Sequence, residues 1–382
     1  MSSVVNPSVW RVVGAPLVAG GDGPLNGETV AVKDLYDVAG FAVGAGVPAF
    51  LGAPATTNAP AVQALLDAGA DIVGIAQTDE FAYSIAGRNA HYGTPPNPAV
   101  PGGVPGGSSS GPASAVALGE ASIGLGTDTA GSIRVPASYQ GLWGLRTTHG
   151  SVPSSGIVPL APTFDAPGWL TRDAATLRAA AAATLVERAE AGPFVVDPAL
   201  SAHTEPDVRT AFETFVGDRF ERVDLGDPQE FFETFRTVQQ SEAWRTHGAW
   251  IEAHPGALGD DVAARFALAA AVTPAQEAAA RANLARLRAK LDDLLGRRVL
   301  LVPSASSTAP SLTMDAVDTE RTRQGTLKLT SIAGLTGRPA LSAPLLDVPQ
   351  PGGRPSLPVG LSLVGPHHSE LALIALAEGL AP

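Results

Sequence analysis

The sequence predicts an α/β fold, because short apolar runs alternate with stretches of helical periodicity through its first half. Hydrophobic residues make up 45% of the 382 residues and charged residues only 16%. That balance supplies a large apolar core and differs from the polar, highly charged composition of disordered chains. The sequence contains no internal repeat and no obvious interdomain linker. We therefore expect a compact globular protein.

The first predicted strand, at residues 29–32, is an apolar run that ends at Lys33. Residues 60–69 carry apolar side chains at helical spacing and finish at a glycine, which predicts a helix. Residues 71–75 then predict a second strand. The order strand, helix, strand is typical of an α/β unit.

The next segment contains two glycine turns. Residues 98–111 are mostly Gly, Pro and Ser and predict a loop. A short helix of small residues is expected at 113–118 and an apolar strand at 121–125, after which a second glycine turn exposes residues 128–134. Two sharp turns therefore bracket one small helix.

The second half begins with a strongly helical, Ala-rich region from about residue 171 to 296. Within it, the Glu/Arg patterning over residues 274–295 predicts a solvated amphipathic helix. Residues 298–303 and 361–364 predict two further buried strands. We interpret this half as scaffold.

Composition and charge exclude several classes of function. The formal net charge is -12 and no Lys/Arg cluster is present, which argues against nucleic acid binding and favours a small neutral or cationic substrate. With no cysteine, a thiolate metal site and a cysteine nucleophile are excluded. The seven histidines lack HExxH and HxH spacing, so we expect neither a metal nor another cofactor.

The sequence carries no signal for export or membrane insertion. Residues 1–11 lack the basic start and apolar core of a signal peptide, and no apolar run approaches the ~18 residues of a membrane span. We therefore expect a cytoplasmic protein that binds no membrane. Either a monomer or a homodimer is compatible with this sequence.

Lys33 is the first candidate for chemistry. The chain uses only three lysines against 22 arginines. A lysine in an apolar site can lose its proton and act as a base, whereas an arginine cannot. The alternative is a lysine at a strand end whose ammonium group reaches water.

The second candidate is the glycine turn that ends at Ser132. Its consecutive backbone N–H groups could point at one spot and bind a developing oxyanion, with the Ser132 hydroxyl placed to attack the same carbonyl. The four residues of this turn are Thr129, Ala130, Gly131 and Ser132. A phosphate loop is the alternative, but GxxxxGK[ST] is absent and the glycine spacing does not match a dinucleotide site.

Two motifs together strongly resemble the amidase signature family of serine hydrolases: GGSSSG at residues 106–111 and GTDTAGSIRVPA at residues 126–137. A lone GGSSSG is usually a linker, but here the 24 residues that separate Ser108 from Ser132 match the family's spacing. Lys33 lies in the Ala-Val-Lys-Asp context in which the family carries its catalytic lysine. The resemblance extends over nearly the whole chain.

The resemblance implies a mixed, twisted central β-sheet covered on both faces by α-helices, in a single amidase domain over residues 1–382. Within this domain it implies a catalytic core at about residues 25–175. A helical, variable region is expected at about residues 176–296, and the chain is expected to return to the sheet at about residues 297–382.

The resemblance also implies a mechanism that needs no metal. Ser132 attacks the carbon of a small-molecule amide, and Ser108 relays the proton of Ser132 to a neutral Lys33. A cis peptide after Gly107 holds Ser108 in place, and the N–H groups of the turn stabilise the oxyanion. Burial can lower a lysine pKa by roughly 3–5 units, which would keep Lys33 neutral. Supporting roles are implied for Ser109, Asp128 and Arg134.

Within the family, three stretches outside the catalytic motifs resemble the plant indole-3-acetamide hydrolases: residues 79–85, 89–95 and 164–169. This resemblance implies a small primary amide of the aryl- or alkyl-acetamide type as substrate. The candidate pocket residues are Tyr83, Ile85 and Thr129.

Two residues depart from the family's pattern. Ala130 replaces the usual glycine of the oxyanion turn, and alanine tolerates positive φ poorly. Arg146 begins Arg-Thr-Thr where the family usually has Lys-Pro-Thr.

Two other activities stay open: an esterase or carbamate hydrolase with the same triad, and the amidase subunit of a tRNA-dependent amidotransferase. The acidic charge and short length disfavour the amidotransferase subunit.

Overall fold

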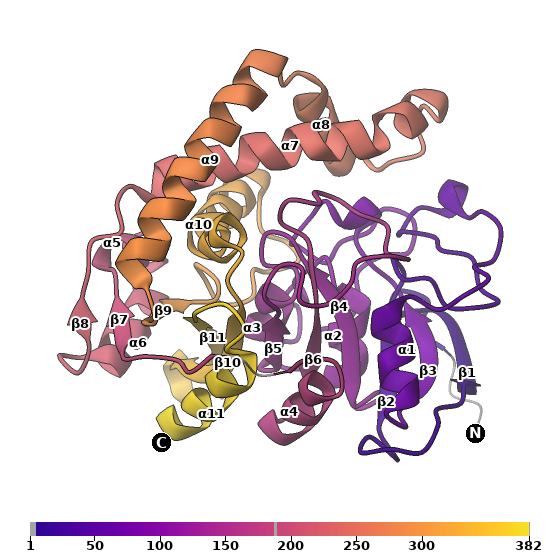
Figure 1. Ribbon diagram of the computed structural model, residues 1–382, viewed down its shortest axis with the longest axis horizontal. Coiled ribbons are helices and arrows are strands. Elements are labelled where there is room, and N and C mark those ends of the chain that lie inside the picture. The colour runs from indigo at the N-terminus through magenta and orange to yellow at the C-terminus, as the bar shows by residue number, and fades with distance from the viewer. Residues whose placement is uncertain (1–4, 187–188, 382) are drawn as a thin grey trace.

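One sheet runs through the computed structural model, which describes residues 5–186 and 189–381 (Figure 1). Within these residues the sheet has 11 strands in the order β1-β3-β2-β4-β6-β5-β10-β11-β9-β7-β8. Strand β2 pairs in parallel with β3 and β4, and β7 pairs in parallel with β8 and β9. The other pairs are antiparallel. The strands are β1 Trp10–Val18, β2 Thr29–Lys33, β3 Asp71–Ala76, β4 Ile123–Asp128, β5 Trp143–Arg146, β6 Ala166–Thr171, β7 Phe194–Val196, β8 Glu221–Arg222, β9 Val299–Pro303, β10 Ala340–Val348 and β11 Leu357–Val364.

Helices occupy most of the connections between these strands. The α-helices are α1 Pro60–Asp67, α2 Ser110–Ala117, α3 Arg134–Gln140, α4 Ala174–Ala182, α5 Pro198–Ser201, α6 Pro206–Val216, α7 Pro228–Ala253, α8 Asp260–Ala270, α9 Pro274–Leu295, α10 Ala316–Thr336 and α11 Glu370–Leu380. Short 3-10 helices lie at Pro48–Phe50, Glu80–Ala82 and Pro351–Gly353.

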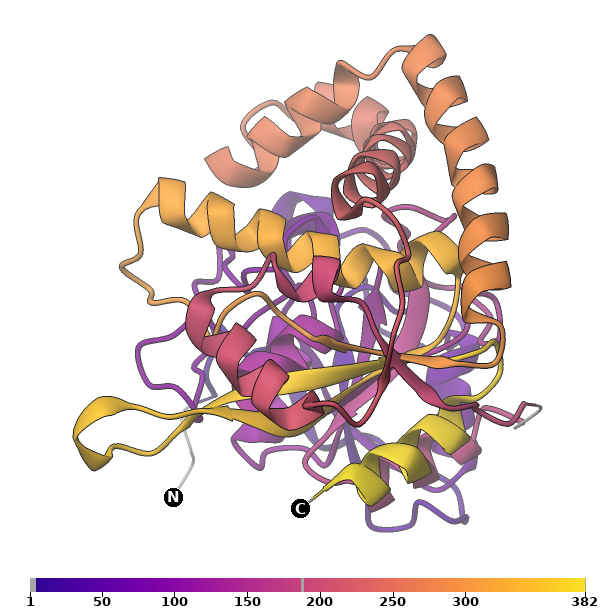
Figure 2. The same cartoon turned by 90° about the vertical axis from the view of Figure 1, so that its left-hand side faces the viewer.

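The sheet buries both of its faces. On β6, Trp169 packs in a core cluster that includes side chains of α1, α4 and α11, whereas its neighbour Leu170 packs with side chains of α2 and α3. Because neighbouring residues of a strand point to opposite faces, these helices lie on opposite sides of the sheet. Figures 1 and 2 show the same arrangement. The predicted mixed α/β sheet with helices on both faces is confirmed.

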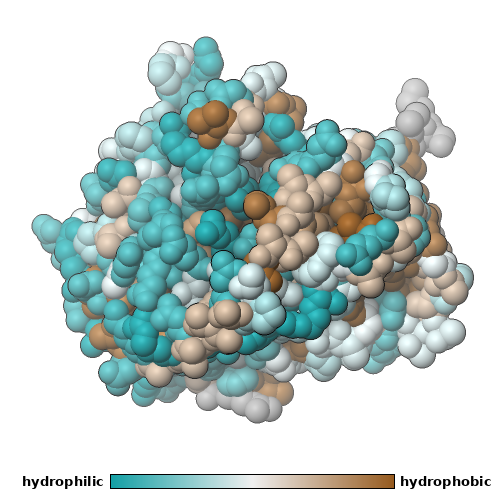
Figure 3. Space-filling model, turned by 90° about the horizontal axis from the view of Figure 1, so that it is seen from above, coloured by the Kyte–Doolittle hydropathy of each residue, from teal (hydrophilic) through white to brown (hydrophobic). Residues whose placement is uncertain are grey.

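A further helical layer lies above the sheet in Figure 1, with α10 nearest the strands and α7, α8 and α9 outside it (Figures 1 and 2). Seen from above, the surface is largely hydrophilic, with hydrophobic side chains gathered toward the right of the view (Figure 3). In the described part of the chain, no helix is both long and apolar enough to cross a bilayer.

Helix α9 shows how local sequence sets these boundaries. Thr273 accepts a hydrogen bond from the backbone N–H of Gln276, and the Gln276 side chain bonds back to Thr273, which forms a capping box. A proline at the first helical position and Gly296 after the last one fit both ends. The predicted amphipathic helix at residues 274–295 is therefore confirmed, with its leucine stripe buried.

The region at residues 176–296, which was expected to be helical and variable, also contributes strands β7 and β8, which extend the sheet beyond β9. They are only 3 and 2 residues long, too short to show a period in the sequence. Strands β1, β5, β6 and β10 were also not predicted. Strand β1 lies before residue 25, where the catalytic core was expected to begin, and pairs with β3.

Strands β2 and β4 position the catalytic candidates. They are parallel neighbours, so their carboxyl ends reach the same edge of the sheet. Lys33 is the last residue of β2 and Asp128 is the last residue of β4. Both residues therefore lie at the same edge of the sheet, at the ends of apolar strands.

Candidate active site

Lys33 lies in a dry environment made largely of hydroxyl groups. Its side chain is fully buried, and its Nζ donates hydrogen bonds to Ser108 Oγ at 2.8 Å and to Thr127 Oγ1 at 2.9 Å. Burial lowers the pKa of Lys33 from 10.5 to about 7, although the carboxylates of Asp79, Asp128 and Asp165 oppose this shift. A neutral amine is therefore accessible near pH 7. Thr127 was not predicted as a site residue.

Ser108 is held by its backbone. The peptide bond between Gly107 and Ser108 is cis, as the resemblance implies. The carbonyl oxygen of Ser108 accepts hydrogen bonds from the Thr78 hydroxyl at 2.9 Å and from the Asp79 N–H at 3.3 Å. These contacts fix the orientation of the residue whose hydroxyl meets Lys33.

Asp79 is hydrogen bonded to the serine loop, residues 106–111, which carries Ser108. Its carboxylate accepts hydrogen bonds from the Gly87 N–H at 3.0 Å and from the Ser110 hydroxyl at 3.1 Å, and burial raises its pKa. The stretch 79–85 was expected to bear on the subfamily and not on catalysis. Its Asp79 nevertheless contacts the loop that carries Ser108.

The oxyanion turn wraps around the carboxylate of Asp128. This carboxylate accepts hydrogen bonds from the Gly131 N–H at 2.9 Å and the Ile133 N–H at 3.2 Å, and from the Nη2 of Arg134 at 2.9 Å. The prediction that Gly131 offers its N–H to substrate therefore needs correction, because Asp128 already uses that donor. The structure supports the bracing roles expected of Asp128 and Arg134.

Three other donors of the turn stay available. Within the described residues, no hydrogen bond engages the N–H groups of Thr129, Ala130 or Ser132. The turn places its positive φ, 114°, at Gly131, and Ala130 is not among the residues with positive φ. The alanine found in place of the family's glycine therefore does not strain the turn.

Arg146 is a site residue that the sequence analysis did not identify as one. It is fully buried at the end of β5, where its guanidinium lies 3.2 Å from Asp128 Oδ1, also contacts the Asp128 carbonyl, and donates to the Phe164 carbonyl at 2.7 Å. Burial alone would raise the pKa of Asp128, but the charges of Arg134 and Arg146 hold it well below its usual range. The sequence did contain a signal for Arg146: like Lys33, it is a charged residue at the end of an apolar strand.

The Ser132 cavity is defined as the space of about 250 Å³ that Ser132 lines together with Thr129, Ala130, Tyr83 and Ile85. The structure thus brings the predicted pocket residues to the predicted nucleophile. Within the described part of the chain, the Ser132 hydroxyl makes no hydrogen bond, so the expected link to Ser108 is not formed here.

Ser109 and Thr330 join the turn to its surroundings. The Ser109 N–H donates to the Ser132 carbonyl at 3.2 Å and its hydroxyl donates to the Thr127 carbonyl at 3.2 Å, which supports the bracing role expected of Ser109. The Thr330 hydroxyl, on α10, donates to the Ala130 carbonyl at 2.6 Å. Thr330 lies in a stretch that resembles the family's late helix, but no role was predicted for it.

A second cavity of about 290 Å³ adjoins the turn and is lined by Thr127, Thr129 and Leu160 among others. It shares Ala82, Thr129 and Leu160 with the Ser132 cavity. The Thr129 hydroxyl donates to Asp165 at 2.5 Å, so its side chain is already engaged. Among the described residues, no group of three or more His, Asp or Glu is arranged to hold a metal ion.

Comparison with known proteins agrees with this geometry. The Amidase family profile matches residues 17–215. Amidase 1 of Arabidopsis thaliana is 35% identical over 402 residues, which cover 94% of this chain and 93% of that protein. The chain belongs to the amidase family. It is therefore an amidase, an enzyme that hydrolyses amides.

Two further amidase family relatives support the assignment. A solved amidase structure superimposes with a TM-score of 0.83 at 30% identity and covers 94% of this chain and 86% of that chain. The 2-amino-5-chloromuconic acid deaminase of Comamonas testosteroni is 35% identical over 392 residues, which cover 94% of this chain and 82% of that protein. The likeness to the amidase family thus extends over almost the entire chain.

Proposed function

We propose that this amidase converts a small primary carboxamide to a carboxylate and ammonia through an acyl-enzyme on Ser132. The observation that carries the proposal is the 2.8 Å hydrogen bond between Lys33 Nζ and Ser108 Oγ in a fully buried site. It joins a lysine that can be neutral to a hydroxyl in the serine loop, beside the turn that carries Ser132.

The first half of the reaction forms the acyl-enzyme. Lys33, when neutral, accepts the proton of the Ser108 hydroxyl, and Ser108 accepts the proton of Ser132 as the Ser132 oxygen attacks the amide carbon. The negative charge that develops on the substrate oxygen meets the free N–H groups of the turn. Protonated Lys33 returns its proton through Ser108 to the amide nitrogen, and ammonia leaves.

The second half uses water in place of Ser132. Water loses a proton to the Ser108–Lys33 pair and adds to the acyl carbon, and the Ser132 oxygen leaves with that proton. The carboxylate product is released and Lys33 is neutral again. Atoms balance: one amide and one water give one carboxylic acid and one ammonia.

The cavities support a small substrate. The two cavities that Thr129 lines measure about 250 and 290 Å³, just below the range of about 300–1,000 Å³ for ligand pockets. The resemblance of residues 79–85, 89–95 and 164–169 to the plant indole-3-acetamide hydrolases favours an amide of the aryl- or alkyl-acetamide type. Ester or carbamate attack would need the same nucleophile and oxyanion donors, so these substrates belong in the same test.

The test is ammonia release from a panel of primary amides that includes indole-3-acetamide, next to matched esters and carbamates. The Ser132→Ala variant is the control, because it removes one oxygen from a buried site and leaves the fold in place. Amide turnover that is lost in this variant would support the proposal. If only esters or carbamates are hydrolysed, Ser132 remains the proposed nucleophile, but the proposed substrate class is wrong.

A further inference from the structure

Three arginines converge on the Ser132 cavity from three helices. Arg236 of α7, Arg265 of α8 and Arg323 of α10 line the same space as Ser132, with Glu320 as the one acidic residue of its lining. The cavity lining therefore carries an excess of two positive charges in a chain whose net charge is -12. The negative net charge of the chain favours a neutral or cationic substrate. The positive charge of the cavity lining favours an anionic one.

The arginines lie close to the predicted pocket residue Tyr83. Arg265 reaches the Tyr83 carbonyl at 3.4 Å. Burial raises the pKa of Tyr83 to about 12, and the positive charges of all three arginines act against that rise. All three arginines are thus close enough to Tyr83 for their charges to act on its hydroxyl group.

The three guanidiniums differ in their partners. Arg265 pairs with Asp261 at 2.8 Å and Arg323 with Glu320 at 2.7 Å, each within its own helix. Arg236 is exposed and lies over the Phe232 ring at 5.1 Å, and among the described residues no carboxylate pairs with it. Arg236 therefore presents an uncompensated charge to the cavity.

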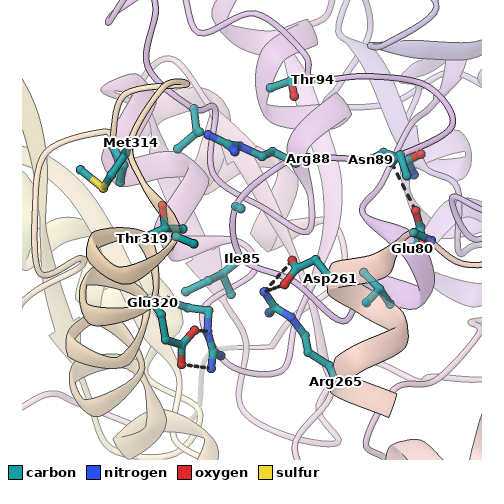
Figure 4. Close-up of a pocket in the computed structure, with 18 of the residues that line it drawn as sticks. Glu80, Ile85, Arg88, Asn89, Thr94, Asp261, Arg265, Met314, Thr319 and Glu320 are labelled. Carbon is teal, nitrogen blue, oxygen red and sulfur yellow. Dashed lines mark hydrogen bonds and ion pairs between the residues drawn. The ribbon is translucent and has the colours of Figure 1, made fainter. Parts of the chain in front are cut away.

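Figure 4 shows a larger adjoining cavity, of about 630 Å³, that shares Ile85, Arg265, Glu320 and Arg323 with the Ser132 cavity. In this view Arg265 reaches Asp261, and Ile85 lies between these two residues and Glu320. Arg265 and Arg323 therefore line both spaces, whereas Arg236 lines the Ser132 cavity and not the larger one. A group attached to the far end of a substrate at Ser132 would meet all three arginines within the Ser132 cavity.

We propose that the amide substrate carries a carboxylate at the end remote from the reacting amide, and that Arg236, with Arg265 and Arg323 beside it, binds this carboxylate. The inference rests on the proposed function of the Ser132 site. Guanidinium groups bind carboxylates in a planar, bidentate manner, and such charge-assisted hydrogen bonds are about twice as strong as neutral ones.

The experiment compares two sets of primary amides of equal length. One set carries a terminal carboxylate (succinamate, glutaramate and adipamate), and the other carries a methyl ketone in its place (4-oxopentanamide, 5-oxohexanamide and 6-oxoheptanamide). We expect kcat/KM for ammonia release to favour the best carboxylate over its ketone by at least about tenfold, as one charge-assisted hydrogen bond allows. In Arg236→Gln this preference should fall about tenfold, through a rise in KM for the carboxylate.

Two further variants complete the test. Arg236→Lys keeps the charge and should retain most of the preference, and Arg245→Gln removes an exposed arginine of the same helix outside the cavity and should leave the preference as in the wild type. Equal turnover of both sets, or an unchanged preference in Arg236→Gln, would overturn the inference and leave amide hydrolysis intact. If neither set nor the acetamide panel releases ammonia, the proposed function fails, and the inference fails with it.

Discussion

At the residue scale, the proposed mechanism depends on an uncharged amine at Lys33, although the carboxylates of Asp79, Asp128 and Asp165 lie near enough to favour its charged form. The Nζ of Lys33 bonds to two hydroxyls rather than to a carboxylate. A directly bonded carboxylate would hold the proton on the amine and raise its pKa. Burial can therefore dominate, and the pKa of Lys33 falls to about 7.

The first prediction concerns the pH dependence of turnover. Only the neutral amine can accept a proton, so kcat/KM for an uncharged amide should rise about tenfold per pH unit below about pH 7 and level off above it. The same shift acts on stability: from about pH 7 to 10.5 the unfolded chain holds this proton and the native state does not, so the free energy of unfolding gains from rising pH in that window. A rate that is flat from about pH 5.5 to 8 would contradict the assignment of Lys33 as base.

The second prediction removes the base while keeping its shape. Lys33→Met should lower ammonia release by about 10²–10⁴-fold, the range for loss of general base catalysis. The melting temperature should not fall, because the variant no longer buries an amine. Lys290→Met, at an exposed position of α9, is the matched control. Near-normal turnover in Lys33→Met would rule out the proposed relay.

At the element scale, the turn between β4 and α3 is built around one carboxylate. Asp128 satisfies backbone donors on the far side of the turn and two guanidiniums at once, so both ends of the turn are tied to the end of β4. Among the described residues, the N–H groups of residues 129, 130 and 132 donate no hydrogen bond to this carboxylate. Rigid donors of this kind stabilise an oxyanion without reorganising during the reaction.

The third prediction tests this role of Asp128. Asp128→Asn leaves Arg134 and Arg146 buried without their counter-ion, and breaking a buried pair in this way costs about 3–5 kcal/mol of unfolding free energy. Urea unfolding of the variant measures this cost. Asp22→Asn, on the surface, should change the free energy by less than about 0.5 kcal/mol. A loss of similar size in the two variants would show that Asp128 does not organise the turn.

Individual helices and strands differ in how well the sequence predicts them. Long periodic or strongly apolar segments, such as β2 and α9, were identified close to their observed bounds. Strand β6 was missed because Pro167 and Gly168 interrupt its pattern, and only its neighbours β4 and β5 define it as a strand. Ser108 and Ser132 were predicted as catalytic candidates from their motifs and from the 24 residues that separate them. Arg146 and Asp79 act through contacts between distant segments, which spacing along the chain does not encode.

At the scale of the whole molecule, the C-terminal half contributes to the site. Helix α10 covers the oxyanion turn, where Thr330 donates to the Ala130 carbonyl and the Thr330 carbonyl accepts from Arg134 at 3.1 Å. Helices α7, α8 and α10 also supply the cavity arginines. The half that was interpreted as scaffold therefore helps to shape the substrate cavity.

The last prediction measures this coupling between halves of the chain. Thr330→Val has nearly the same shape but lacks the hydroxyl, so the buried Ala130 carbonyl loses its donor and the peptide unit that bears the Gly131 N–H loses an anchor. We expect a loss of about 1–3 kcal/mol in unfolding free energy. We also expect kcat to fall about tenfold at little change in KM, because the lost order matters most when the oxyanion forms.

The control for this variant is Thr210→Val on α6, whose exposed hydroxyl bonds only within its own helix. It should change neither kcat nor the free energy of unfolding measurably. If Thr330→Val lost stability but kept its kcat, α10 would stabilise the turn without affecting catalysis. A drop in kcat confined to Thr330→Val would instead show that the second half of the chain holds the oxyanion donors in their reactive geometry.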